Sequence, residues 1–223
     1  MVQVFSRVRG ALLSGACAML LSGCAGNVAP EVKRLPERVE LSGTFYRGEA
    51  NQSGPQVLAS LLSQQGIVIT PGLLEKPLHL PGAEDKLQQN MQNLAREYGL
   101  VVYPLDSKLP ALLTQVAAGY PVMVRFSEGS AFWAEPRYAI LSGYDRNKQK
   151  VLLRAGMNRR QLMDFASFES AFEKAGGWAI LIQKPAQIPA VVDRSRWLKA
   201  ADELAQAGEE NAAAQARKAL AAQ

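Results

Sequence analysis

The stretch Gln52-Ser53-Gly54-Pro55 lies at the junction between a polar loop and the first strong helical pattern of this chain. Pro55 suits the first turn of a helix, where its missing N–H group has no helical partner in any case. An apolar stripe at helical spacing follows it: Val57, Leu58, Leu61 and Leu62. Gly66 marks the end of the pattern. We therefore expect a helix that begins at about Gly54-Pro55, after a polar loop that ends at Ser53.

Helical patterns continue to about residue 118, and strand patterns follow them. The apolar spacing predicts further helices over residues 83–98 and 109–118, with extended chain at 100–104. After Pro121, short apolar runs bounded by turn residues predict strands at 121–126, 137–144, 150–154 and 178–183. A brief strand at 162–165 and a short helix at 167–175 lie between the last two. Helices first and an antiparallel sheet afterwards predict an α+β domain.

The C-terminal residues 194–223 form a separate pattern after a linker marked by Pro185 and Pro189. Two helices, at 197–207 and 211–221, are predicted on either side of Gly208. Their spacing resembles one tetratricopeptide helical hairpin. Because such units normally need about three copies to bury a core, this hairpin must dock on the main domain or on a partner. It is either a packing appendage or the working surface of a scaffold.

The N-terminal residues 1–23 are typical of a secretory signal peptide, with a basic start and an apolar stretch too short to span a bilayer. The stretch Leu21-Ser22-Gly23-Cys24 resembles the lipobox of bacterial lipoproteins. The resemblance implies cleavage before Cys24 and acylation of that residue, palmitate included. Ala25 favours an outer-membrane lipoprotein facing the periplasm, with residues 24–38 as a tether. The alternative is an ordinary cleaved signal in which Cys24 has no role.

Composition excludes several kinds of site. The formal net charge of +5 is mild, and no stripe of basic and aromatic residues indicates nucleic-acid binding. Cys17 and Cys24 are the two cysteines, and both are consumed if the signal is cleaved and Cys24 is acylated. The single histidine, His79, rules out a multi-histidine zinc site. No metal and no cofactor is indicated.

Gln52-Ser53-Gly54-Pro55 resembles the Gln-Cys-Gly-Pro nucleophile motif of the double-glycine leader peptidases, family 39 of the papain-like cysteine peptidases. Two later stretches follow in the family's order. Residues 137–145 resemble the strand that usually begins His-Tyr-Ala, and residues 151–156 resemble the next strand, which often ends in Asp-Pro. The resemblance implies a papain-like peptidase fold, with N-terminal helices packed on an antiparallel sheet, over residues 39–185.

The family's catalytic residues, carried over by position, are all replaced. Ser53 stands at the nucleophile position and Arg137 at the histidine position. Ala155 stands where a residue would orient the imidazole, and Gly48 where a glutamine would stabilise the oxyanion. The family's chemistry needs a thiolate and an imidazole base, and a guanidinium stays protonated at any physiological pH. We therefore expect a degenerate site without cysteine-peptidase activity.

The leading functional hypothesis is an envelope lipoprotein whose peptidase-like domain binds a polypeptide without cleaving it. The predicted contacts are Ser53, Gly54, Trp133, Arg137 and Tyr138. Arg137 beside a helix N-terminus would suit a ligand carboxylate. One alternative is residual hydrolysis that uses Ser53 as the nucleophile. The other is a scaffold that acts through the C-terminal hairpin. The expected partners are a membrane, through Cys24, and a peptide or protein.

Overall fold

The computed structural model describes residues 29–49, 52–129 and 134–223. The expected signal peptide, Cys24 and Trp133 lie outside these ranges. Within them, no helix is long and apolar enough to cross a membrane.

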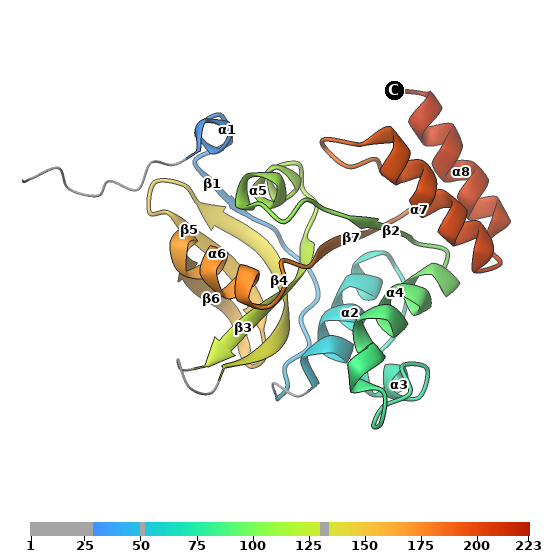
Figure 1. Ribbon diagram of the computed structural model, residues 1–223, viewed down its shortest axis with the longest axis horizontal. Helices are drawn as coiled ribbons and strands as arrows, with labels where there is room; N and C mark the ends of the chain where they lie inside the picture. The colour runs from blue at the N-terminus through green and yellow to red at the C-terminus, as the bar shows by residue number, and fades with distance from the viewer. Residues whose placement is uncertain (1–28, 50–51, 130–133) are drawn as a thin grey trace, which may run out of the picture.

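One antiparallel sheet organises the chain, in the order β2-β7-β3-β4-β5-β6, with β1 paired to the end of β4 (Figure 1). Its strands are β1 (Arg38–Glu40), β2 (Val101–Pro104), β3 (Val122–Gly129), β4 (Ala134–Asp145), β5 (Lys150–Ala155), β6 (Asn158–Asp164) and β7 (Ala179–Gln183). Every pairing is antiparallel. The predicted α+β class is confirmed.

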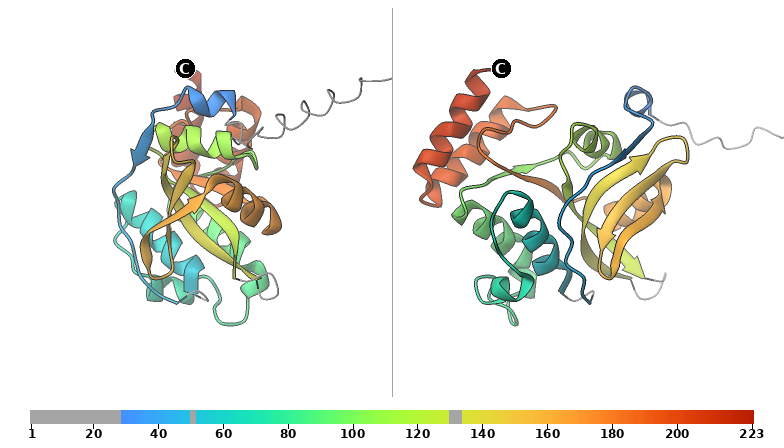
Figure 2. Two further views of the ribbon diagram at one scale, coloured as in Figure 1. Left: turned by 90° about the vertical axis from the view of Figure 1, so that its left-hand side faces the viewer. Right: turned by 180° about the vertical axis from the view of Figure 1, so that it is seen from behind.

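Helices cover both faces of the sheet, and the views in Figure 2 show the two layers. Strand β3 alternates between them, since Met123 packs into one hydrophobic core while Val122 and Val124 pack into the other. The Met123 face is covered by α2 (Ser53–Gln64), α4 (Leu87–Glu97) and the short α3 (Pro71–Glu75). The opposite face is covered by α5 (Leu109–Ala117) and α6 (Phe165–Lys174).

Most boundaries agree with the sequence analysis to within a few residues, and β6 is the main exception. The sequence predicts a brief strand at 162–165, whereas β6 runs from Asn158 to Asp164. Its side chains are exposed or half-buried throughout. An edge strand of this kind has no apolar alternation, so hydrophobic periodicity cannot reveal it. The helix predicted over 83–98 is likewise divided into a 3₁₀ turn, η2 (Glu84–Lys86), and α4.

Part of the segment expected to be a tether is instead built into the domain. Residues Pro30–Lys33 form α1, whose Val32 is 2% exposed and joins the core beneath α5. Strand β1 then pairs with residues 143–145 of β4. Gly143 permits this pairing, because a Cβ there would lie 2.4 Å from the Val39 carbonyl oxygen. A single buried valine among charged residues gives no periodic signal, so the sequence did not predict this packing.

The C-terminal hairpin, α7 (Arg194–Gln206) and α8 (Glu210–Ala221), docks on the main domain. Trp197 is fully buried, and its indole Nε1–H donates to the Ala216 carbonyl oxygen at 2.8 Å. Its ring centroid lies 5.9 Å from that of Tyr103 on β2. The Tyr103 hydroxyl oxygen in turn accepts from the Asp193 N–H at 2.9 Å. Hairpin and sheet therefore share one core, as the appendage hypothesis expects.

Replacing Trp197→Ala should destabilise the whole domain by about 3–5 kcal/mol, because it opens a cavity between α7, α8 and β2. Urea denaturation followed by far-UV circular dichroism measures the change. Leu198→Ala is the matched control, since the Leu198 side chain is 40% exposed on the same helix and its loss should cost well under ~1 kcal/mol. Equal effects of the two substitutions would contradict the shared core.

Candidate functional site

The first turn of α2 meets the middle of β4. Ser53, the first residue of α2, is 5% exposed. Its Oγ accepts a hydrogen bond from the Tyr138 backbone N–H at 3.2 Å. Strand β5 pairs with β4 only from Ile140 onward, so it offers no acceptor to Tyr138. Ser53 supplies that acceptor and ties the helix N-terminus to the sheet.

Gly54 allows α2 and α4 to approach closely at this point. A Cβ at Gly54 would lie 2.9 Å from Leu87 Cδ2 and 3.2 Å from Met91 Sδ. Both of those side chains belong to the apolar face of α4 and are buried. A larger residue would therefore require the ends of the Leu87 and Met91 side chains to shift. Gly54 shapes the packing behind Ser53, and it is itself buried rather than open to a ligand.

Two further predicted positions, Gly48 and Ala155, also come close to one another. The Gly48 N–H donates to the carbonyl oxygen of Gly156, the residue after Ala155, at 3.4 Å. The Ala155 side chain is 5% exposed and belongs to the core beneath α6. A methyl group in an apolar core cannot orient an imidazole. The structure thus brings the loop before α2 and the end of β5 together without restoring a catalytic group there.

A buried amide that the sequence analysis missed occupies the space beside Gly48. A Cβ at Gly48 would lie 1.7 Å from Gln56 Nε2, so the Gln56 side chain fills the place of a side chain at position 48. Gln56 is 4% exposed, and its Nε2 donates to the Glu49 carbonyl oxygen at 3.5 Å. Gln56 follows Ser53 by three residues, which puts both on the same side of α2. The three-residue spacing between Ser53 and Gln56 was the feature of the sequence that could have identified Gln56.

Arg137 is engaged by carboxylates on its own sheet. Its Nη2 lies 2.8 Å from Glu135 Oε2, and its Nε lies 4.0 Å from Glu128 Oε2. Residues 128 and 135 are partners across β3 and β4. Side chains alternate along a strand, so Arg137 shares a face with Ala139, while Tyr138 faces the other core. A ligand carboxylate at Arg137 would have to compete with both glutamates.

Tyr138 is buried against Trp178, with ring centroids 5.7 Å apart in an edge-on arrangement. Burial raises the pKa of the Tyr138 phenol, because the phenolate would lose its hydration, and the nearby Arg125 only partly opposes this effect. The phenol therefore stays protonated at neutral pH and cannot serve as a base. His79 lies on an exposed loop after α3. Within the described residues, the hydrogen bond of the Ser53 side chain is with a backbone donor and not with a base.

Comparison with solved structures identifies the fold. A C39-like peptidase from Bacillus anthracis matches 67% of this chain and 98% of its own length, with a TM-score of 0.50 and 15% sequence identity. The chain has a C39-like peptidase fold. The C39-like resemblance stated from the motifs is therefore confirmed at the level of the fold, and identity this low shows the fold alone.

Two further solved structures are similar to this C39-like chain. One is a double-glycine-motif protease from an AMS/PCAT transporter in complex with the leader peptide, with a TM-score of 0.47, 13% identity and coverage of 65% of this chain and 94% of that one. The other is the peptidase domain of Streptococcus ComA, a bi-functional ABC transporter involved in a quorum-sensing pathway, with a TM-score of 0.48, 15% identity and coverage of 66% and 98%. No protein-family model and no curated protein matches the sequence.

Ser53 should be inert toward a fluorophosphonate probe, because its buried hydroxyl has a backbone N–H partner and no base to remove its proton. In-gel fluorescence after incubation with the probe measures labelling, with an active serine hydrolase in the same tube as the positive control. Wild type and Ser53→Ala should both remain at background. Labelling of the wild type that disappears in Ser53→Ala would establish a nucleophile and contradict the expectation.

Proposed function

We propose that this chain is an envelope lipoprotein whose C39-like domain binds a polypeptide and does not cleave it. The observation that carries the proposal is the hydrogen bond from the Tyr138 N–H to Ser53 Oγ. It turns the residue at the nucleophile position into a structural contact. The fold that supports peptidase chemistry in its relatives is kept here, while the groups that perform that chemistry are replaced.

The chemical argument concerns the proton that a nucleophile must lose. A serine hydroxyl attacks only when an adjacent base accepts its proton. Arg137 stands at the base position, and its guanidinium can only donate. Ala155 and Gly48 offer no polar side chain to orient a base or to stabilise an oxyanion. An acyl-transfer reaction would therefore lack the general base that activates its nucleophile.

Binding is proposed at the N-terminal half of β4, where the Arg137 side chain lies on the face of the sheet opposite α2. Arg137 is the cation of this region, and its side chain is 20% exposed. A ligand carboxylate would exchange with Glu135 for the guanidinium, a planar group that recognises carboxylates in bidentate fashion. Ser53, Gly54 and Tyr138 are buried and act by shaping the backbone around Arg137. Trp133 remains a predicted contact.

The proposed cellular setting rests on the N-terminal sequence. A lipobox-like ending at Cys24 would place the domain on the periplasmic face of the outer membrane, held by acyl chains that each contribute ~0.8 kcal/mol per buried CH₂. Residues 25–29 separate Cys24 from α1. A separation of so few residues would keep the domain close to the membrane surface.

Metabolic labelling with radioactive palmitate tests the anchor. Wild type should be labelled and should sediment with outer membranes, whereas Cys24→Ala should lose both the label and the membrane association. Cys17→Ala is the matched control and should behave as wild type, because residue 17 would leave with the signal peptide. Retention of the label by Cys24→Ala would contradict acylation at this residue.

Affinity capture from envelope extracts tests polypeptide binding. Arg137→Gln removes the cation while avoiding a third carboxylate beside Glu128 and Glu135, and it should release polypeptides that wild type retains. Arg159→Gln, on the exposed edge strand β6, is the control and should retain them. Bound polypeptides should be recovered at full length by mass spectrometry after prolonged incubation. Identical captured sets, or shortened polypeptides, would contradict binding without cleavage.

A further inference from the structure

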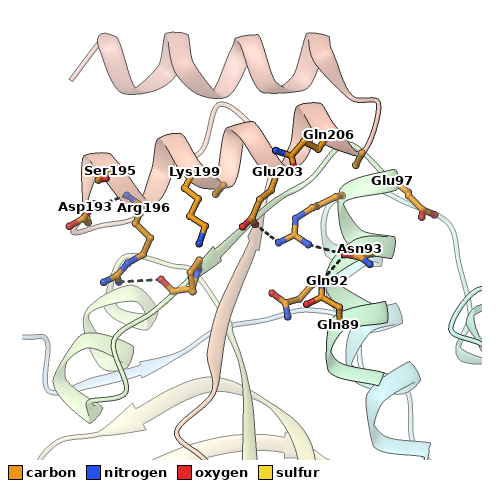
Figure 3. Close-up of a pocket in the computed structure, with 14 residues that line it drawn as sticks. Gln89, Gln92, Asn93, Glu97, Asp193, Ser195, Arg196, Lys199, Glu203 and Gln206 are labelled. Carbon is orange, nitrogen blue, oxygen red and sulfur yellow. Dashed lines mark hydrogen bonds and ion pairs between the residues drawn. The ribbon is translucent and has the colours of Figure 1, made fainter. Parts of the chain in front are cut away.

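A polar cleft of about 1010 Å³ lies between α4 and α7, away from Ser53 and Arg137 (Figure 3). One wall is the side of α4 that faces away from the core. The other wall is α7, which the docking of the C-terminal hairpin places opposite. Its volume is at the upper end of the range of small-ligand pockets, ~300–1,000 Å³, so it has room for several residues of an extended peptide.

The two walls are polar stripes at helical spacing. On α4 the stripe consists of Gln89, Gln92, Asn93 and Arg96. On α7 it consists of Arg196, Lys199, Glu203 and Gln206. Residues three and four apart share one face of a helix, so each helix turns a continuous polar face toward the other. Direct contact between two polar helix faces would bury little apolar surface and would stabilise the fold little. An open cleft therefore remains between them.

One ion pair bridges the walls and fixes their separation. Arg96 Nη2 lies 2.5 Å from Glu203 Oε2, and the Arg96 side chain is 8% exposed. Arg96 Nη1 also donates to Asn93 Oδ1 at 3.2 Å. Its Nε is buried and has no hydrogen-bond partner. The Arg96 end of this pair is shielded from solvent, whereas the Glu203 side chain is 34% exposed, and the pair links α7 to α4.

Lys199 is the cation that remains available in the cleft. Arg196 is occupied by Asp106 Oδ1 at 2.8 Å and by the Pro104 carbonyl oxygen at 3.2 Å. Within the described residues, Lys199 has neither an ion pair nor a side-chain hydrogen bond. Figure 3 shows its side chain extending from α7 into the open space. Glu97, at the end of α4, points away from it in the same view.

We propose that this cleft binds an extended polypeptide segment that carries an acidic side chain. The amides of Gln89 and Gln92 each use one N–H within α4, toward Asn93 Oδ1 and the Gln88 carbonyl oxygen. Each keeps a second N–H and its carbonyl oxygen, which, with the amide of Gln206, match the C=O and N–H groups of a peptide backbone. The Lys199 ammonium pairs with the acidic side chain in a charge-assisted hydrogen bond. No aromatic ring lines the cleft among the described residues, so it lacks the stacking surface that nucleobases use.

The inference is independent of the proposed function, because it uses none of the residues around Ser53 and Arg137. It also gives the C-terminal hairpin a role in binding, in addition to its packing against the main domain. Trp197 packs inward and anchors α7, while Lys199, two residues later, lies on the cleft-lining side of the helix. The hairpin therefore supplies half of a binding site that the C39-like domain lacks without it.

A display library of random peptides about ten residues long, ~33 Å when extended, tests the proposal on the mature full chain. Selected peptides should be enriched in Asp and Glu relative to the input library. Synthetic copies of the selected peptides, measured by fluorescence anisotropy, should bind Lys199→Gln about tenfold more weakly, the effect of losing one charge-assisted hydrogen bond. Replacing their acidic residues with amides should weaken binding to wild type by a similar factor, and added salt should do the same.

Two variants separate occupancy of the cleft from a general charge effect. Lys174→Gln removes an exposed lysine on α6, and it should bind the selected peptides as wild type does. Gln92→Tyr adds bulk to the cleft wall and should abolish binding, while circular dichroism reports an unchanged fold. Failure to select any binding peptide, selection without acidic enrichment, or equal affinities for wild type and Lys199→Gln would overturn the proposal. Loss of capture by Arg137→Gln with unchanged peptide binding would leave this proposal standing.

Discussion

The antiparallel pairing of β4 is the interaction on which the rest of the structure depends. This strand is 12 residues long, pairs with β1, β3 and β5, and receives the first turn of α2. Its side chains alternate between two separate hydrophobic cores, so helices must cover both faces of the sheet. Where β5 leaves it, at Ile140, an unpaired N–H at Tyr138 requires another acceptor. Ser53 Oγ supplies that acceptor and links the N-terminus of α2 to the strand.

The geometry around Ser53 supports the proposal that a peptidase-like site is kept here in shape without its chemistry. The N-terminus of α2 stays in place because a serine hydroxyl accepts the Tyr138 N–H. Leaving a buried N–H unsatisfied would cost about 1–3 kcal/mol, so the hydroxyl has a structural reason to be there. Gln56 fills the space beside Gly48, and Ala155 extends the core beneath α6. Each replaced position is occupied by a group that serves packing or hydrogen bonding.

The C-terminal hairpin changes what the domain offers to its surroundings. Trp197 and Tyr103 join the hairpin to the sheet in one core, and the Arg96–Glu203 pair sets the distance between α7 and α4. A rigid polar cleft results, assembled from two segments about a hundred residues apart in sequence. The scaffold hypothesis is thereby refined, because the hairpin is part of the folded body and its exposed side faces a cleft shared with α4.

The sequence alone determined the features that depend on neighbouring residues. Apolar periodicity located α2, α4, α5 and the central strands, since each buries one face and repeats accordingly. The order of the motifs indicated the fold, and the resemblance led to the prediction that Gly48, Ser53, Arg137 and Ala155 stand at the family's catalytic positions. Gly54 and Pro55 likewise indicated that Ser53 lies at a loop-to-helix junction.

Only the tertiary structure decided the contacts between distant segments. Packing of α1 and β1 on the domain, the length of β6, the filling of the Gly48 position by Gln56, and the pairing of Arg137 with Glu135 all required it. The cleft between α4 and α7 did so as well. Each arises where two segments meet across space, and local periodicity carries no information about which polar face will oppose which. Lys199 is one more solvated lysine in the sequence, and it lines a binding cleft only because Trp197 turns α7 toward α4.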